Sequence, residues 1–235
     1  MLEWTPEVIR FRMDAARVNR FEWLLAARIA PYLPPCARIC DAGCGLGDLS
    51  LALAECGFHV TAVDTDERAL AYLRRRAEGR TVEPLCADVL SAHCETPYDA
   101  MVFCFFGATA ETVEAVRRQC GGKAFLIKRD SAAQRFGTKK RPPHRFSVEQ
   151  TCAELDELGV SYRLERFTAE MGQPFRSLSE ATRFFALYDG GIAPTADEVA
   201  ARLIRTDYDE FPLYYPVQAN LGMFILENEG RERCL

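Results

Sequence analysis

A glycine-rich turn between an apolar strand and a helix is the feature that most constrains this chain. Residues 41–47 read Asp-Ala-Gly-Cys-Gly-Leu-Gly, at the end of an apolar segment over 38–42 and directly before a predicted helix over 48–55. Glycines at alternating positions let a backbone turn sharply and approach a ligand without an intervening Cβ. The sequence therefore predicts a ligand site at the carboxyl end of a buried strand.

Short apolar strands alternate with helices after this turn. Strands are predicted over 59–63, 82–86, 100–105 and 123–128, and helices over 67–76 and 109–119. A helix over 148–158, a strand over 161–167 and a last strand over 221–226 follow. This alternation is typical of βαβ units, so we expect an α/β fold, a Rossmann-like, mostly parallel seven-stranded sheet with helices on both faces.

Two segments add to this sheet. Residues 1–35 are predicted to form an N-terminal helical cap, with Thr5 as the N-cap, Pro6 at the first helical position and a second helix begun by Asn19. Residues 168–215 contain helices predicted to begin near Ser177 and at Thr195, and we interpret them as a helical insertion on the substrate side. The whole chain, 1–235, is expected to be a single domain.

Composition limits the classes of function. The 235 residues are 49% hydrophobic and 27% charged, which is typical of a soluble globular protein. The sequence has no apolar run of about 18 to 20 residues and no basic-then-apolar leader, so we expect a cytoplasmic protein without membrane contact. The net charge of −5 disfavours a nucleic-acid substrate. Many of the ten cysteines lie in apolar stretches and are expected to be reduced.

The glycine turn and later positions resemble class I S-adenosylmethionine-dependent methyltransferases. That family places an acidic residue before three glycines at every second position, as residues 41–47 do here. It also places an acid at the end of the second strand, where this chain has Asp64, and another just after the third strand, where it has Asp88. The resemblance covers roughly residues 38–128, and these positions follow one another at the carboxyl ends of successive strands.

The resemblance implies a binding site for S-adenosylmethionine, with S-adenosylhomocysteine as product, in a donor-binding half over 36–130. It implies that Asp64 accepts hydrogen bonds from both ribose hydroxyls, with Thr65 along the adenine edge. Asp88 would hold the adenine amino group with Val89 beside it, and the end of the fourth strand would lie beside the methionine moiety. The predicted cofactor-binding residues are Asp41, Gly43, Cys44, Gly45, Leu46, Gly47, Asp64, Thr65, Asp88, Val89 and Phe103.

Two other functions stay open at this point. An NAD-linked oxidoreductase would carry its third glycine or alanine at the position of Asp48, where a carboxylate would face the pyrophosphate. A protein that binds the donor without catalysis is the second alternative.

The fourth strand lacks the Asn/Asp-Pro-Pro-aromatic ending of many base methyltransferases, so base methylation is not predicted. Asp99 lies at the amino end of this strand, so a metal site is not predicted either.

The methyl acceptor is expected to be a small molecule, but its identity is not encoded in a recognisable motif. His144 is the candidate general base, against the alternative of a solvated loop histidine. A basic run suits an anionic acceptor or is an exposed charge run: Lys128, Arg129, Lys139, Lys140, Arg141 and Arg145. A set of aromatic residues suits an aromatic acceptor pocket or a buried core: Phe175, Phe184, Phe185, Tyr188, Tyr214 and Tyr215.

Overall fold

The computed structural model describes residues 3–130, 147–189 and 194–227. The chain divides into two compact units. The sheet unit comprises residues 22–130, 145–167 and 221–235, and the insertion unit comprises residues 1–21, 131–144 and 168–220. Among the described residues, no helix has both the length and the apolar character needed to cross a membrane.

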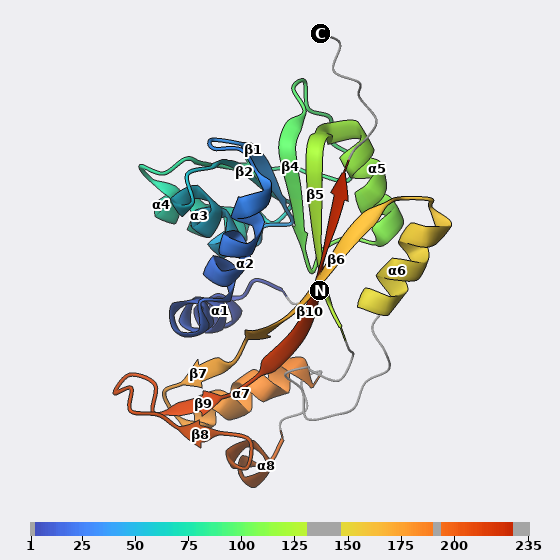
Figure 1. Cartoon of the computed structure of the whole chain (residues 1–235). Helices are drawn as coiled ribbons and strands as arrows, with labels where there is room; N and C mark the ends of the chain where they lie inside the picture. The colour runs from blue at the N-terminus through green and yellow to red at the C-terminus, as the bar shows by residue number, and fades with distance from the viewer. Residues whose placement is uncertain (1–2, 131–146, 190–193, 228–235) are drawn as a thin grey trace. The chain divides into compact units, whose positions relative to one another are not determined.

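A seven-stranded sheet forms the centre of the fold, in the order β3-β2-β1-β4-β5-β10-β6 (Figure 1). Neighbouring strands from β3 to β5 pair in parallel, and β10 pairs antiparallel with β5. The predicted mostly parallel sheet of seven strands is confirmed. Its strands are β1 (Arg38–Ala42), β2 (His59–Asp64), β3 (Val82–Cys86), β4 (Tyr98–Cys104), β5 (Cys120–Arg129), β6 (Tyr162–Glu170) and β10 (Gln218–Glu227).

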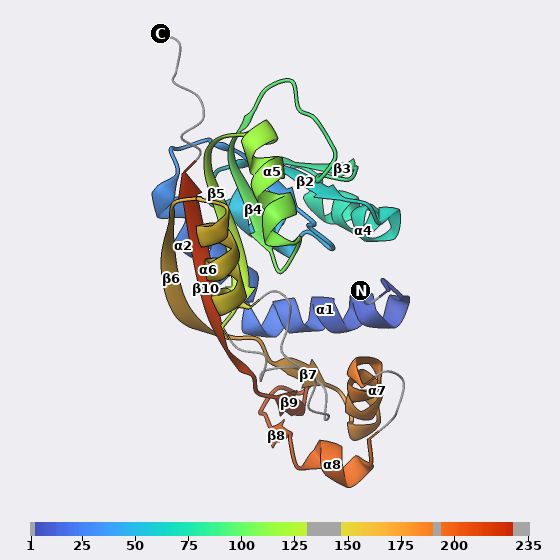
Figure 2. The same ribbon diagram turned by 90° about the vertical axis from the view of Figure 1, so that its right-hand side faces the viewer.

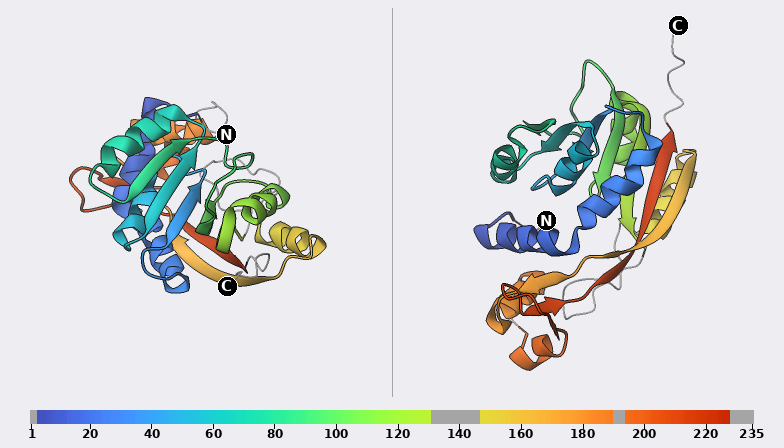
Figure 3. Two further views of the ribbon diagram at one scale, coloured as in Figure 1. Left: turned by 90° about the horizontal axis from the view of Figure 1, so that it is seen from above. Right: turned by 60° about the vertical axis from the view of Figure 1, so that its left-hand side comes forward.

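Helices cover both faces of the sheet (Figures 1 and 3). One face carries α2 (Phe21–Ile29), the short 3-10 helix η1 (Ala30–Tyr32), α3 (Asp48–Glu55) and α4 (Glu67–Ala77). The other carries α5 (Thr109–Gln119) and α6 (Val148–Glu157), which lie side by side in Figure 2. Under these two helices, Phe103, Leu126 and Val148 are fully buried in one hydrophobic cluster. The central strands β1, β4 and β5 are mostly buried, as parallel strands covered on both faces are.

The strand order places a functional site at a definite edge. β1 lies between β2 and β4, so the direction in which successive strands are added reverses between β1 and β4. In open α/β sheets, the carboxyl ends of the strands at such a reversal form the ligand-binding crevice. The glycine turn follows the carboxyl end of β1, so the predicted motif lies at this edge of the sheet.

The insertion unit combines helices with a small second sheet. Its elements are α1 (Pro6–Asn19), β7 (Gln173–Phe175), α7 (Leu178–Tyr188), α8 (Ala196–Ala200), β8 (Ile204–Arg205) and β9 (Leu213–Tyr215). The three strands form an antiparallel sheet in the order β7-β9-β8. The two helices predicted to begin near Ser177 and at Thr195 are present as α7 and α8. The three short strands were not predicted, because strands of two or three residues are too short to show an alternating pattern.

The N-terminal helix belongs to the insertion unit. Thr5 caps α1 as predicted, accepting a hydrogen bond from the backbone N–H of Val8 at 3.3 Å. Arg176, which follows β7, donates to the buried carboxylate of Asp14 in α1, with the closer contact at 2.5 Å. The predicted cap over 1–35 is thus divided, because α1 lies in the insertion unit and α2, from residue 22 onward, lies in the sheet unit.

The aromatic residues of the 175–188 segment form the core of the insertion unit. Phe175 and Phe185 have no exposed surface, and Phe184 is 1% exposed. The ring of Phe184 makes edge contacts with Phe11 and Phe175, at centroid distances of 5.1 and 5.2 Å. The buried-core alternative is therefore correct for these three phenylalanines. Tyr188, Tyr214 and Tyr215 are partly buried around the same cluster or beside it.

Candidate functional site

Packing and backbone conformation both require glycine in the turn after β1. Gly43, Gly45 and Gly47 have φ values of 70°, 54° and 74°, a region that side-chain-bearing residues seldom occupy. A Cβ on Gly43 would lie 2.5 Å from ring carbons of Phe106, and one on Gly47 would overlap the side chain of Leu73. The turn is consequently packed between the end of β4 and helix α4.

Asp64 at the end of β2 fixes the turn by hydrogen bonds. The backbone N–H groups of Gly43 and Cys44 donate to the carbonyl of Val63 at 2.8 and 3.0 Å. The N–H of Gly45 donates to one carboxylate oxygen of Asp64 at 2.8 Å, and the N–H of Asp66 donates to the other at 2.9 Å. A carboxylate has about four lone-pair positions, so Asp64 can still accept two hydroxyl groups in the orientation that these amides impose.

Asp41 at the end of β1 is a buried acid. Its side chain is 2% exposed and accepts a hydrogen bond from the Ser50 hydroxyl at 2.5 Å. Burial raises the pKa of this carboxyl to about 6, the Ser50 hydrogen bond opposes the rise, and the neighbouring charge of Asp64 adds to it. Near neutral pH, a nearby positive charge would favour its ionised form.

Arg76 is a partner of the turn that the sequence did not indicate. Its guanidinium pairs with the carboxylate of Asp48, which is 5% exposed, and donates to the carbonyl of Leu46 at 3.2 Å. The charge of Asp48 is therefore balanced inside the protein. Arg76 lies in a run of three arginines at the end of α4, and nothing in the sequence distinguishes it from its two neighbours.

The residues predicted at the adenine end lie at the carboxyl ends of β2 and β3. Thr65 and Asp88 are exposed, and Val89 is 3% exposed. One carboxylate oxygen of Asp88 accepts the N–H of Leu90 at 3.0 Å and the other accepts the Ser91 hydroxyl at 2.9 Å. The Asp88 carboxylate thus stabilises its own turn, and its role towards adenine stays a prediction.

At the end of β4, the aromatic residue that reaches the glycine turn is Phe106. Phe103 is fully buried in the core, where its ring stacks on Phe106 at a centroid distance of 6.5 Å. Phe103 therefore supports this side of the site from beneath, and a direct contact with the donor stays a prediction. The ring of Phe106 occupies the space beside Gly43 that a Cβ would need.

Lys128 is a buried lysine at the end of β5, so the alternative of an exposed charge run does not hold for this member of the basic run. It is 1% exposed, and its ammonium group donates to the carbonyls of Gly107 and Phe106 at 3.0 and 3.3 Å. Burial lowers its pKa to about 8, against the opposing effect of Glu154.

The candidate general base and most of the basic run lie outside the described residues. These are His144, Lys139, Lys140, Arg141 and Arg145.

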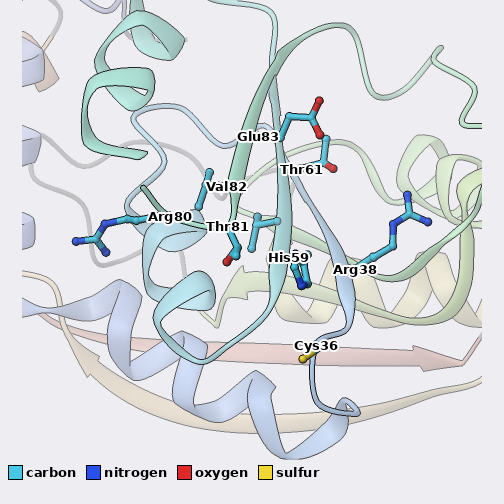
Figure 4. Close-up of a pocket in the computed structure, with 9 residues that line it drawn as sticks. Cys36, Arg38, His59, Thr61, Arg80, Thr81, Val82 and Glu83 are labelled. Atoms are coloured by element: carbon cyan, nitrogen blue, oxygen red, sulfur yellow. The ribbon is translucent and has the colours of Figure 1, made fainter. Parts of the chain in front are cut away.

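A separate depression of about 630 Å³ lies at the amino ends of β1, β2 and β3, at the opposite end of these strands from the glycine turn. Figure 4 shows that the side chains of Arg38 and Arg80 point away from each other. Arg80 pairs with Glu55 at 2.7 Å, and the Arg38 guanidinium lies 5.6 Å from the ring centroid of Tyr98. The polar groups here do not converge on a common point, so this depression is not a second candidate site.

Known proteins resemble a part of this chain that includes the glycine turn. Residues 39–121 match the family model described as a methyltransferase domain. A Geobacillus protein described as a methyltransferase is 49% identical over 45 residues, which cover 19% of this chain and 18% of the relative. The Bacillus subtilis methyltransferase relative YqeM is 43% identical over 48 residues, covering 20% and 19% respectively. These matches span about a fifth of the curated relatives' length.

The fold is shared over a much larger part of the chain. The YcgJ protein of Bacillus subtilis superposes with a TM-score of 0.55 at 14% identity, covering 90% of this chain and all of the other. A structure from Bacillus halodurans, described as a methyltransferase, gives a TM-score of 0.55 at 14% identity, covering 88% and 98%. A TehB-like, S-adenosylmethionine-dependent methyltransferase from Corynebacterium glutamicum gives 0.53 at 16% identity, covering 93% and 94%.

Proposed function

We propose that this chain, which matches a methyltransferase domain model over residues 39–121 and shares its fold with an S-adenosylmethionine-dependent methyltransferase, transfers a methyl group from S-adenosylmethionine to a small-molecule acceptor. The observation that carries the proposal is the glycine turn tied to Asp64. The turn has positive φ values at all three glycines, and the N–H of Gly45 holds the Asp64 carboxylate at 2.8 Å in a fixed orientation. This combination suits a ribose-bearing ligand at the end of β2.

The charges around the turn suit a cationic ligand better than a pyrophosphate. Asp41 and Asp64 lie at the ends of neighbouring strands, whereas the carboxylate of Asp48 is neutralised by Arg76. When bound, the donor would supply a methyl group on a positively charged sulfur, and its transfer would leave that sulfur as a neutral thioether. Acidic groups nearby stabilise such a cation, and they would repel the phosphates of a dinucleotide.

The chain's own residues would act chiefly by alignment. Asp64 would orient the ribose, and Phe106 closes one side of the turn. Holding two reactants in line is the main requirement of a displacement at a methyl carbon. A general base is needed only for an acceptor that arrives protonated, and His144 in that role stays a prediction. The contribution of residues 168–215 to the acceptor side also stays a prediction.

Calorimetry with S-adenosylmethionine, S-adenosylhomocysteine and NAD tests this proposal. We expect the first two to bind in the micromolar range and NAD to show no binding. Gly45→Val should abolish binding, because a branched side chain would occupy the ligand's approach. Gly79→Val is the matched control, since Gly79 also has a positive φ, of 74°, but a Cβ at that position would have nothing within 4 Å.

Two results would overturn the proposal. One is binding of NAD without binding of S-adenosylhomocysteine. The other is unchanged S-adenosylhomocysteine affinity in a folded Gly45→Val variant. A third result, donor binding without methyl transfer to any acceptor in a panel of small molecules, would leave a donor-binding protein and remove the catalytic part of the proposal.

A further inference from the structure

Phe105, directly after β4, combines exposure with a backbone conformation that bulky residues rarely adopt. Its φ is 55°, in the left-handed region, and 40% of its surface is exposed. Its N–H donates to the carbonyl of Ile127 in β5 at 3.1 Å, which fixes the backbone in place. Glycine would adopt this conformation without strain, so a large aromatic side chain here suggests a role beyond the fold.

A buried ammonium group holds the residues that follow. Lys128 donates to the carbonyls of Phe106 and Gly107, and Gly107 has a φ of 72°. The ring of Phe106 packs against Gly43 of the glycine turn. Phe105 is therefore held at a fixed place beside the candidate donor site by contacts on both sides, from β5 and from the turn after β1.

Arg129 at the end of β5 completes a pair with Phe105. Its guanidinium carbon lies 4.8 Å from the centroid of the Phe105 ring, and its side chain is partly buried. β4 and β5 are neighbours in the sheet, so both residues stand at the same carboxyl edge. A guanidinium that lies over an aromatic face can still direct N–H groups in its own plane towards a carboxylate.

The charge of this edge differs from that of the donor side. The ends of β1 and β2 carry Asp41 and Asp64, whereas the end of β5 carries Arg129. The neighbouring acid, Asp130, already faces Arg166 of β6 at 3.6 Å. Arg129 thus contributes a positive charge at the end of β5, whereas a cationic donor would meet the acids at the ends of β1 and β2.

We propose that Phe105 and Arg129 together bind the methyl acceptor, and that the acceptor is a planar aromatic carboxylate. Its ring packs against Phe105, and its carboxylate accepts hydrogen bonds from the Arg129 guanidinium. This inference rests on the proposed methyltransferase function and deepens it by naming the acceptor class. It concerns binding alone, so its test does not depend on knowing which atom is methylated.

The test uses 4-fluorobenzoate as the probe, detected by the broadening of its fluorine resonance with the full chain, both free and saturated with S-adenosylhomocysteine. Two competitors separate the features: cyclohexanecarboxylate keeps the charge without the aromatic ring, and benzamide keeps the ring without the charge. The variants are Phe105→Leu and Arg129→Gln. Their controls are Leu158→Ala and Arg117→Gln, which change an exposed apolar residue and an exposed arginine on the surface of the same unit.

We expect Phe105→Leu to weaken 4-fluorobenzoate binding about three- to tenfold and to remove the preference for it over cyclohexanecarboxylate. Arg129→Gln should weaken it by a similar factor and remove the preference over benzamide. The two controls should bind as the wild type does. Phe105→Tyr keeps the ring and should retain wild-type affinity, which separates loss of the ring from damage to the fold.

Equal 4-fluorobenzoate affinity in the wild type, Phe105→Leu and Arg129→Gln would overturn the inference. So would a wild type that binds the three probes equally or binds none of them. Calorimetry with S-adenosylhomocysteine on the same samples reports on the proposed function separately. If S-adenosylhomocysteine binds but the protein does not distinguish the three probes, only the proposed acceptor class is wrong. If S-adenosylhomocysteine does not bind, the methyltransferase proposal itself is wrong.

Discussion

Replacement of Asp41 by asparagine should stabilise the free protein at neutral pH. Burial raises the pKa of Asp41 from 3.8 to about 6, so the ionised carboxylate is disfavoured in the folded state. Each pKa unit corresponds to about 1.4 kcal/mol, so ionisation at pH 7 costs the fold about 3 kcal/mol. Asparagine carries no charge and keeps an oxygen that accepts the Ser50 hydroxyl, but its amide N–H groups need partners, at a cost of about 1 kcal/mol.

The sign of the pH dependence follows from the direction of the pKa change. Between pH 3.8 and about 6, the folded protein binds more protons at Asp41 than the unfolded chain does. The contribution of this group to stability is therefore largest at low pH and falls as the pH rises through this window. Asp41→Asn should raise the free energy of unfolding by about 1 to 3 kcal/mol at pH 7, and the gain should disappear near pH 4.

Urea unfolding of wild type and variant at pH 4 and pH 7 measures this difference. Asp209→Asn, a change at an exposed acid of the insertion unit, is the control for a general charge effect. An equal change in stability at both pH values, or a loss of stability at pH 7, would refute the assignment of a charge penalty to Asp41. The affinity for S-adenosylmethionine should depend on pH in the opposite direction to stability, because a cationic donor favours the ionised form of Asp41. The wild type should bind the donor more tightly at pH 7 than at pH 5, and Asp41→Asn should not.

Three further perturbations test other contacts of the site. Asp64→Ala should weaken donor binding by about 1.5 to 3 kcal/mol in calorimetry, since two charge-assisted hydrogen bonds are lost, and unchanged affinity in a folded variant would remove Asp64 from the ribose role. Arg76→Met should lower the free energy of unfolding by about 2 to 4 kcal/mol, because it leaves the Asp48 carboxylate buried and unpaired. Adding Asp48→Asn should restore much of that loss in urea unfolding, and an additive pair would contradict the coupling. Burial lowers the pKa of Lys128 from 10.5, the value for the unfolded chain, to about 8 in the folded protein. Between pH 8 and pH 10.5 the unfolded chain therefore binds more protons, and the free energy of unfolding of the wild type should rise relative to that of Lys128→Met by up to about 3 kcal/mol. A constant difference between wild type and Lys128→Met in thermal unfolding at pH 7 and pH 10 would show that burial does not penalise the charge.

The sequence by itself determined the sheet and indicated the place of the candidate site. The turn after β1 was identifiable because its glycines alternate, and the strands over 38–42 and 82–86 were predicted with the bounds that the structure has. β1 is buried at four of its five positions, and a glycine turn needs no distant residue to be recognised. The acids near the ends of β2 and β3 were identified for the same reason, because Asp64 is the last residue of β2 and Asp88 lies two residues after β3.

Only the tertiary structure decided which distant residues support that site. Arg76 pairs with Asp48 across 28 positions, and Lys128 reaches the carbonyls of residues 106 and 107 from another strand. The tertiary structure also showed that the first 35 residues belong to two units. It showed that Phe184 is buried in a core, although its helical spacing suited a pocket and a core equally. The sequence pattern shows which residues are apolar or charged. Which residues they contact depends on how strands and helices far apart in the chain pack together.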